Sequence, residues 1–433
     1  MKYSIGILNG QVYIDGKFEK INIYIDKEKI QEISTQKLDA KEYFDATGLK
    51  VVPGLIDAHV HLAMNTANGK TADDYKTGSI NAIHGGITTM IDFLDVKDSV
   101  SGIYEAFDQK MQEAKKSYID YGFHTSVAGI KDSPTKIAQA SIEIGAPTIK
   151  MYSTYKPQGI YSSDLDIEKM LIESSKQNIR ILVHCEKDSL IDKKTNDIVA
   201  HSKNRPVLAE TAEVVALAKI AAEHDGNLYI VHTSAGTTIE RLRKDFKEHL
   251  NKQIILESVP HYFLLDDSYY QREDNYLFTM TPPLRDKDEV KKLISYIDDI
   301  SVISTDHCPF LKKQKEKESL KDIPMGVGGM ERSFGLMYDL FGDKIIDKFT
   351  SKPAKIHGLY PQKGQIASKA DADLTFFKVL DKSFVPPHSG DYSIYEHIPT
   401  FTKISAVMNR GEWVLKDGTI LEHQGKYIKR KLG

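Results

Sequence analysis

Eight short apolar runs, separated by stretches with helical spacing, fill the middle of this 433-residue chain and limit the folds that it can adopt. Short apolar runs between helical stretches are typical of buried parallel strands. The runs cover residues 54–58, 88–93, 121–127, 147–151, 180–183, 228–231, 253–257 and 301–304. Helical spacing occurs between them, for example at residues 103–117, 166–177 and 213–224. Eight strand–helix alternations over about 300 residues predict an α/β fold, a (β/α)8 TIM-like barrel.

Both ends of the chain look rich in short strands. The expected strands are residues 5–8, 11–14 and 21–25 near the start and 373–377, 404–409 and 412–415 near the end. Turn dipeptides separate some of them, as at Asn9-Gly10 and Asp15-Gly16. We therefore predict a small β-sandwich domain built from both termini, residues 1–51 and 376–433, beside a barrel domain of residues 52–375. Pairing between the terminal segments would protect their sheet edges.

Composition and charge exclude several classes of function. The net charge of -3 gives no sign of nucleic-acid binding, and Lys-rich runs such as residues 312–317 are interpreted as solvated surface. No run approaches the roughly 18 apolar residues of a membrane span. Cys185 and Cys308 are the two cysteines, which does not suggest a disulfide framework. The first residues lack the apolar core of a signal peptide, so we expect a cytoplasmic protein without nucleic-acid or membrane partners.

The side chains at the expected strand ends favour a metal site. His59 and His61 follow the first apolar run, and the period of two in a strand points both imidazoles the same way. Four further candidate ligands end or follow later runs: Lys150, His184, His232 and Asp306. Because the carboxyl ends of barrel strands meet at one mouth, these groups should converge there. The set is rich enough for two metal ions, which together can deprotonate a water and polarise a carbonyl.

Taken singly, each of these residues has an ordinary explanation. A histidine at a strand end is commonly a polar loop residue, Lys150 could be an exposed lysine that ends a strand, and Asp306 could cap a helix. Tyr155, a further candidate five residues after Lys150, could be a rim aromatic. Other polar residues near the strand ends are predicted to be structural or to support the ligands, namely Asp57, His124, His261 and His307. The metal site is favoured by the combination of six suitable groups at expected strand ends.

Motifs along most of the chain resemble one enzyme family. They lie at residues 53–61, 71–75, 85–93, 120–124, 149–156, 183–186, 231–235, 281–285, 304–310, 353–361 and 370–374. The first reads Pro-Gly-Leu-Ile-Asp-Ala-His-Val-His, and the run from 304 reads Ser-Thr-Asp-His-Cys-Pro-Phe. Together they resemble the cyclic amidohydrolases of the dihydropyrimidinase and hydantoinase type, within the amidohydrolase superfamily.

This resemblance implies a binuclear centre with two divalent metal ions, expected to be zinc. His59, His61 and Asp306 would hold one ion. His184 and His232 would hold the other. Lys150 would bridge both ions as N6-carboxylysine, a carbamate formed with carbon dioxide, whose negative charge nearby cations would favour.

The resemblance also implies the reaction and the substrate contacts. The enzyme would hydrolyse the cyclic amide of a dihydropyrimidine or a 5-substituted hydantoin to an N-carbamoyl amino acid, as in pyrimidine catabolism. Asp306 would carry the proton and Tyr155 would donate a hydrogen bond to the oxyanion. The main chain near Thr281 and Met325 would bind the ureide edge of the ring. A homo-oligomer, dimer or tetramer, is expected.

Two alternatives remain open. The first is another cyclic amidohydrolase, an allantoinase or a dihydroorotase. A dihydroorotase usually grips a carboxylate with an Arg soon after the second His, where this chain has Leu-Ala-Met-Asn at residues 62–65, and allantoinases generally lack the tyrosine at Tyr155. The second is a non-catalytic scaffold such as the collapsin response mediator proteins, which lack metal ligands, whereas this chain keeps all six.

Overall fold

The computed structural model describes residues 3–433, and its centre is a barrel of eight parallel strands. The strands are β8 (Leu55–Val60), β11 (Ile87–Phe93), β12 (Asp120–Ser126), β13 (Thr148–Tyr152), β14 (Arg180–His184), β15 (Leu228–Ile230), β16 (Ile254–Ser258) and β17 (Val302–Ile303). The amide of His61 donates to the carbonyl of His307 at 2.8 Å and joins the first strand to the segment after the last. Each predicted apolar run overlaps one strand, so the predicted barrel is confirmed.

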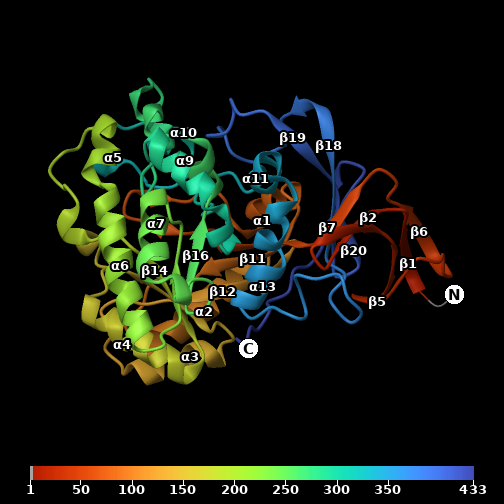
Figure 1. Cartoon of the computed structure of the whole chain (residues 1–433), viewed down its shortest axis with the longest axis horizontal. Helices are drawn as coiled ribbons and strands as arrows, with labels where there is room; N and C mark the ends of the chain where they lie inside the picture. The colour runs from red at the N-terminus through yellow and green to blue at the C-terminus, as the bar shows by residue number, and fades with distance from the viewer. Residues whose placement is uncertain (1–2) are drawn as a thin grey trace.

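Helices surround the barrel in the order expected for alternating strands and helices (Figure 1). They are α1 (Tyr75–His84), α2 (Val100–Ala114), α3 (Pro134–Glu143), α4 (Asp164–Gln177), α5 (His201–Asn204), α6 (Val207–Glu223), α7 (Gly236–Asp245), α8 (Pro260–Leu264), α9 (Lys287–Ser295), α10 (Lys312–Lys315), α11 (Ser333–Phe341), α12 (Ile346–Phe349) and α13 (Ser351–Ile356). Helix α2 begins three residues before the predicted range because the Ser99 hydroxyl caps it, accepting from the amide of Gly102. Among residues 3–433, no helix is both long and apolar enough to cross a membrane.

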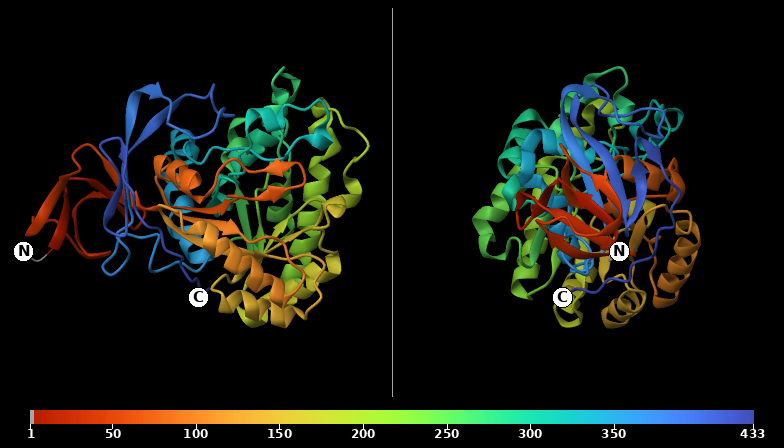
Figure 2. Two further views of the ribbon diagram at one scale, coloured as in Figure 1. Left: turned by 180° about the vertical axis from the view of Figure 1, so that it is seen from behind. Right: turned by 90° about the vertical axis from the view of Figure 1, so that its right-hand side faces the viewer.

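Strands from both ends of the chain form two packed sheets beside the barrel (Figure 2). One sheet has the order β5-β4-β1-β6, with β1 (Tyr3–Leu8), β4 (Asn22–Asp26), β5 (Lys29–Ser34) and β6 (Ala40–Asp45). The other has the order β21-β20-β19-β18-β7-β2-β3, with β2 (Gln11–Ile14), β3 (Lys17–Lys20), β7 (Lys50–Pro53), β18 (Leu374–Phe384), β19 (Thr400–Asn409), β20 (Glu412–Lys416) and β21 (Thr419–Ile420). A short hairpin, β9 (Asn65–Thr66) with β10 (Gly69–Lys70), lies apart from both sheets. Strand β7 pairs antiparallel with β18, so the predicted pairing of the two ends is confirmed.

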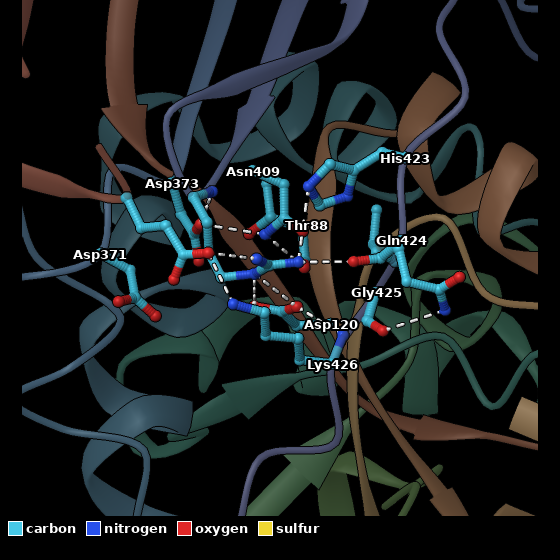
Figure 3. Close-up of polar contacts among 12 residues, drawn as sticks. Thr88, Asp120, Asp371, Asp373, Asn409, His423, Gln424, Gly425 and Lys426 are labelled. Carbon is cyan, nitrogen blue, oxygen red and sulfur yellow. Dashed lines mark hydrogen bonds and ion pairs between the residues drawn. The ribbon is translucent and has the colours of Figure 1, made fainter. Parts of the chain in front are cut away.

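A buried ionic network joins the barrel to the segments that lead into and out of the sheets (Figure 3). Asp120, at the start of β12, accepts from the Arg410 guanidinium at 3.0 Å and from the Lys426 amide at 2.9 Å. Three carboxylates gather closely enough to hold a cation: Asp120, Asp371 and Asp373. The Lys363 ammonium lies 2.7, 3.0 and 2.6 Å from them respectively, so it already supplies the positive charge.

The last residues of the chain lie against the amino ends of the barrel strands, which we call the barrel floor. The amide of Ile428 donates to the carbonyl of Tyr121 at 2.8 Å. The buried Arg430 guanidinium donates to the Thr148 hydroxyl at 2.8 Å, to the His357 carbonyl at 3.1 Å, and to the Phe123 carbonyl. The division of the chain into a domain of residues 1–51 with 376–433 and a domain of residues 52–375 remains a prediction. The tail belongs to the first of these predicted domains and contacts the barrel of the second.

Candidate metal centre and active site

Three predicted ligands meet above β8 and β17. The Nε2 atoms of His59 and His61 each lie 3.1 Å from one Asp306 oxygen, Oδ1. His59 lies near the end of β8, and alternation along the strand brings His61 to the same side. Asp306 follows β17 with a backbone φ of 49°, a left-handed conformation that few residues adopt. The ligand atoms of these residues all lie within 4.8 Å of one another, so the trio could hold a metal ion.

Two further histidines form a neighbouring pair. His184 ends β14 and His232 follows β15, and His184 Nδ1 lies 3.0 Å from His232 Nε2. The His232 ring centroid is 5.5 Å from that of His59, so the pair adjoins the first group. Burial lowers the pKa of His184 to about 4 and the pKa of His232 well below its ordinary value. Neutral imidazoles with converging nitrogens fit a metal such as zinc.

Lys150 lines the same cavity as these two groups. Its side chain is buried on β13, and its ammonium lies 5.2 Å from the ring centroids of both Phe93 and Tyr152. Burial lowers the pKa of Lys150 to about 8, although the charges of Asp306 and Glu257 act in the opposite direction. Near pH 8 a substantial fraction of the Lys150 amine is therefore neutral, and the neutral amine is the form that can add carbon dioxide.

Glu257, which the sequence reasoning did not select, orients two of the histidines. Its Oε1 accepts from His59 Nδ1 at 2.7 Å and from the His232 amide at 3.0 Å. Its Oε2 accepts from the hydroxyls of Tyr229 at 2.7 Å and Ser304 at 3.1 Å. Because His59 donates from Nδ1, its Nε2 faces Asp306, and such support commonly fixes a ligand histidine. Glu257 is the last residue of the predicted strand 253–257, and this position is the signal that could have identified it as a candidate.

A second buried carboxylate supports His184 in the same way. Glu186 Oε2 accepts from His184 Nε2 at 2.7 Å, so the opposite nitrogen faces His232. The Arg205 Nε donates to Glu186 Oε1 at 3.0 Å. Burial acts to raise the pKa of Glu186, but Arg205 and His184 outweigh it and lower this pKa, which keeps the carboxylate charged. Glu186 was not selected although it stands two residues after His184, and Arg205 was missed because its contact with Glu186 depends on the fold.

Tyr155 faces the same cavity from the loop after β13. Its backbone φ is 71°, and its hydroxyl lies 2.5 Å from the Thr281 hydroxyl and 3.4 Å from His184 Nε2. Burial raises the pKa of Tyr155, so the phenol keeps its proton and can donate it in a hydrogen bond. A cavity of about 420 Å³ is lined by all the residues selected from the sequence: His59, His61, Lys150, Tyr155, His184, His232, Thr281, Asp306 and Met325.

Three of the four residues expected to be structural or supporting have such contacts. Asp57 accepts from the amide and hydroxyl of Thr305 at 3.1 and 2.6 Å, which anchors the segment that leads to Asp306. The His124 ring contacts the Thr148 hydroxyl and the Ala58 carbonyl at 2.6 and 2.9 Å. His307 lies 2.8 Å from Asp73, and His261 is buried outside the lining of the cavity.

Known proteins that resemble this chain are named as hydantoinases or dihydropyrimidinases. Residues 50–414 match the amidohydrolase family. The chain is 29% identical over 420 residues to a D-phenylhydantoinase of Escherichia coli, covering 90% of each chain. Its fold matches the crystal structure of a dihydropyrimidinase from Brevibacillus agri with a TM-score of 0.92, at 27% identity and 98% coverage of both chains. A D-hydantoinase (dihydropyrimidinase) from a Thermus species matches with a TM-score of 0.91 at 27% identity, covering 98% of this chain and 99% of that one.

Proposed function

Since this chain belongs to the amidohydrolase family, a metal-dependent group of enzymes, we propose that it hydrolyses the cyclic amide of a dihydropyrimidine or a 5-substituted hydantoin to an N-carbamoyl amino acid. The observation that carries the proposal is the single cavity of about 420 Å³ on which every selected residue converges. Relatives with dihydropyrimidinase and hydantoinase names support the substrate class.

The donor set fits two divalent ions, and we propose zinc. His59, His61 and Asp306 would hold one ion, and His184 with His232 would hold the other. Lys150, as a carbamate, would bridge them, and its buried, partly neutral amine supports that modification. The chemistry that such ions supply is a lowered pKa of water and polarisation of the scissile carbonyl.

Asp306 and Tyr155 would carry the remaining steps. Asp306 would take a proton from the attacking water and deliver it to the ring nitrogen as the carbon–nitrogen bond breaks. Although burial acts to raise it, the pKa of Asp306 is lowered well below its ordinary value by His59 and His61, so the carboxylate is available as a base. The Tyr155 phenol would donate to the developing oxyanion, an effect of about 3–4 kcal/mol in comparable sites.

The substrate would lie against two main-chain segments. We propose that the main chain near Thr281 and Met325 binds the ureide edge of the ring, since both residues line the same cavity as Lys150 and the histidines. A homo-oligomer and a cytoplasmic location are also part of the proposal, and light scattering together with cell fractionation would test them.

A spectrophotometric assay of zinc-loaded protein tests the function. We expect turnover of dihydrouracil or of hydantoin, and little turnover of dihydroorotate. Comparison with allantoin under the same conditions decides between the proposed substrates and the allantoinase alternative. A protein proven to contain two metals that opens no cyclic ureide would contradict the proposal.

A further inference from the structure

A buried lysine behind the cavity wall has no role in the chemistry described so far. Lys315 ends the short helix α10 and is fully buried, whereas Lys312 and Lys313 on the same helix are exposed. The interpretation of residues 312–317 as solvated surface is therefore wrong for Lys315. Burial lowers the pKa of Lys315 to about 7, with the Cys308 thiol acting in the opposite direction. An ammonium group in such surroundings costs free energy that an apolar side chain of similar volume would not.

The partners of Lys315 belong to two separate segments of the chain. Its Nζ donates to the carbonyl of Thr279 at 2.7 Å and to the carbonyl of Gly326 at 2.6 Å. The amide of Gly326 donates to the same Thr279 carbonyl at 3.1 Å. The Lys315 ammonium group and this backbone hydrogen bond together hold two backbone segments that are almost fifty residues apart in sequence.

Both segments continue directly into the cavity wall. Met280 and Thr281 follow Thr279, Met325 precedes Gly326, and all of these except Thr279 line the cavity of about 420 Å³. Helix α10 is itself tied down, since the Gln314 side chain donates to the Lys70 carbonyl at 3.0 Å. A displacement at Lys315 would thus be transmitted to the substrate-facing main chain rather than absorbed by the helix.

We propose that Lys315 is a positioning residue, which holds the Thr279–Thr281 and Met325–Gly326 segments at the spacing that a cyclic ureide requires. The inference rests on the proposed function. It assigns no contact between Lys315 and the substrate. Its effect should fall on substrate binding, because Lys315 donates to the Thr279 and Gly326 carbonyls and not to the metal-ligand candidates, which lie on or after the barrel strands.

Kinetics of Lys315→Met in the full-length, zinc-loaded protein test the proposal. We expect KM for dihydrouracil or hydantoin to rise about tenfold or more, because misplaced binding groups weaken ground-state binding, with kcat changed less than about threefold. Metal content per chain should stay unchanged. The dissociation constant of N-carbamoyl-β-alanine, measured by calorimetry, should rise in parallel with KM. Lys313→Met is the matched control from the same helix and should leave all four quantities unchanged.

The outcomes separate this inference from the proposed function. If the wild-type protein opens no cyclic ureide, the proposed function fails and the inference fails with it. If the wild type is active and folded Lys315→Met keeps its KM, only the inference is overturned. Should Lys315→Met not fold, Lys315→Gln removes the ammonium group that donates to both carbonyls, and an unchanged KM in that variant overturns the inference equally. Loss of metal in either folded variant would assign Lys315 to the metal centre and also overturn it.

Discussion

Replacement of Glu257 should weaken metal binding at the His59 side of the centre. In the wild type, the buried carboxylate accepts four hydrogen bonds, two of which hold His59 and the amide of His232. Glu257→Gln keeps the shape and one acceptor oxygen but removes the charge that stabilises the donating His59 ring. Loss of comparable supporting groups reduces metal affinity about 10- to 100-fold, or about 1.4 to 2.7 kcal/mol. We expect about tenfold for Gln and about 100-fold for Ala.

Competition with a chromophoric chelator measures these affinities, and the ion that His59 would hold should be the one affected. Glu289→Gln is a suitable control, because Glu289 is also a buried carboxylate that accepts from the amide and hydroxyl of Thr237 but lies outside the cavity lining. At saturating zinc, the Glu257→Gln enzyme should recover much of its kcat. A folded Glu257→Gln protein that binds both ions within twofold of the wild type would refute the reasoning.

Substitutions at three further residues test other parts of the structure. Lys150→Ala should lose activity and much of the metal, and propionate should restore part of both, whereas Lys150→Arg should not recover because its guanidinium stays charged. Metal analysis with and without propionate checks this prediction, and full metal retention would contradict it. Tyr155→Phe should lower kcat about 10²- to 10³-fold with unchanged metal content; a change in KM alone would count against the oxyanion role. Arg430→Met should cost about 3 kcal/mol in urea unfolding, because the Phe123 and His357 carbonyls lose a buried donor; a loss under 1 kcal/mol would show that the tail contact is dispensable.

The barrel strands could be predicted because they are buried on both faces and read as continuous apolar runs. Turn chemistry was equally informative: Asp15 and Gly16 have φ values of 48° and 83° and join β2 to β3 as a tight hairpin. Strand β3, with the sequence Lys-Phe-Glu-Lys, was not predicted, because an exposed edge strand carries polar residues on both sides. The same reason applies to β6.

The candidate ligands could be predicted because chain order determines which residues follow which strands. The contacts by which Glu257 supports them could not. Glu257 and His59 are 198 positions apart, and nothing in the sequence around either residue indicates their contact. Lys315 shows the opposite difficulty, since four lysines within six residues indicate solvated surface, and the tertiary fold buries one of them.

The tail on the barrel floor has a consequence for the order in which the molecule is made. The ribosome synthesises all eight barrel strands before Arg430. Until then the nascent barrel lacks the hydrogen-bond donor to the Phe123 carbonyl and the packing of the Ile428 side chain. Strand β7 likewise has no antiparallel partner until β18 is synthesised, some 320 residues later. Large chains tend to fold from the amino end during synthesis, and incomplete chains expose hydrophobic surface that is prone to aggregate. Nascent chains arrested before residue 426 should therefore remain protease-sensitive and chaperone-bound, and the native fold should form only after residues 426–433 have left the ribosome.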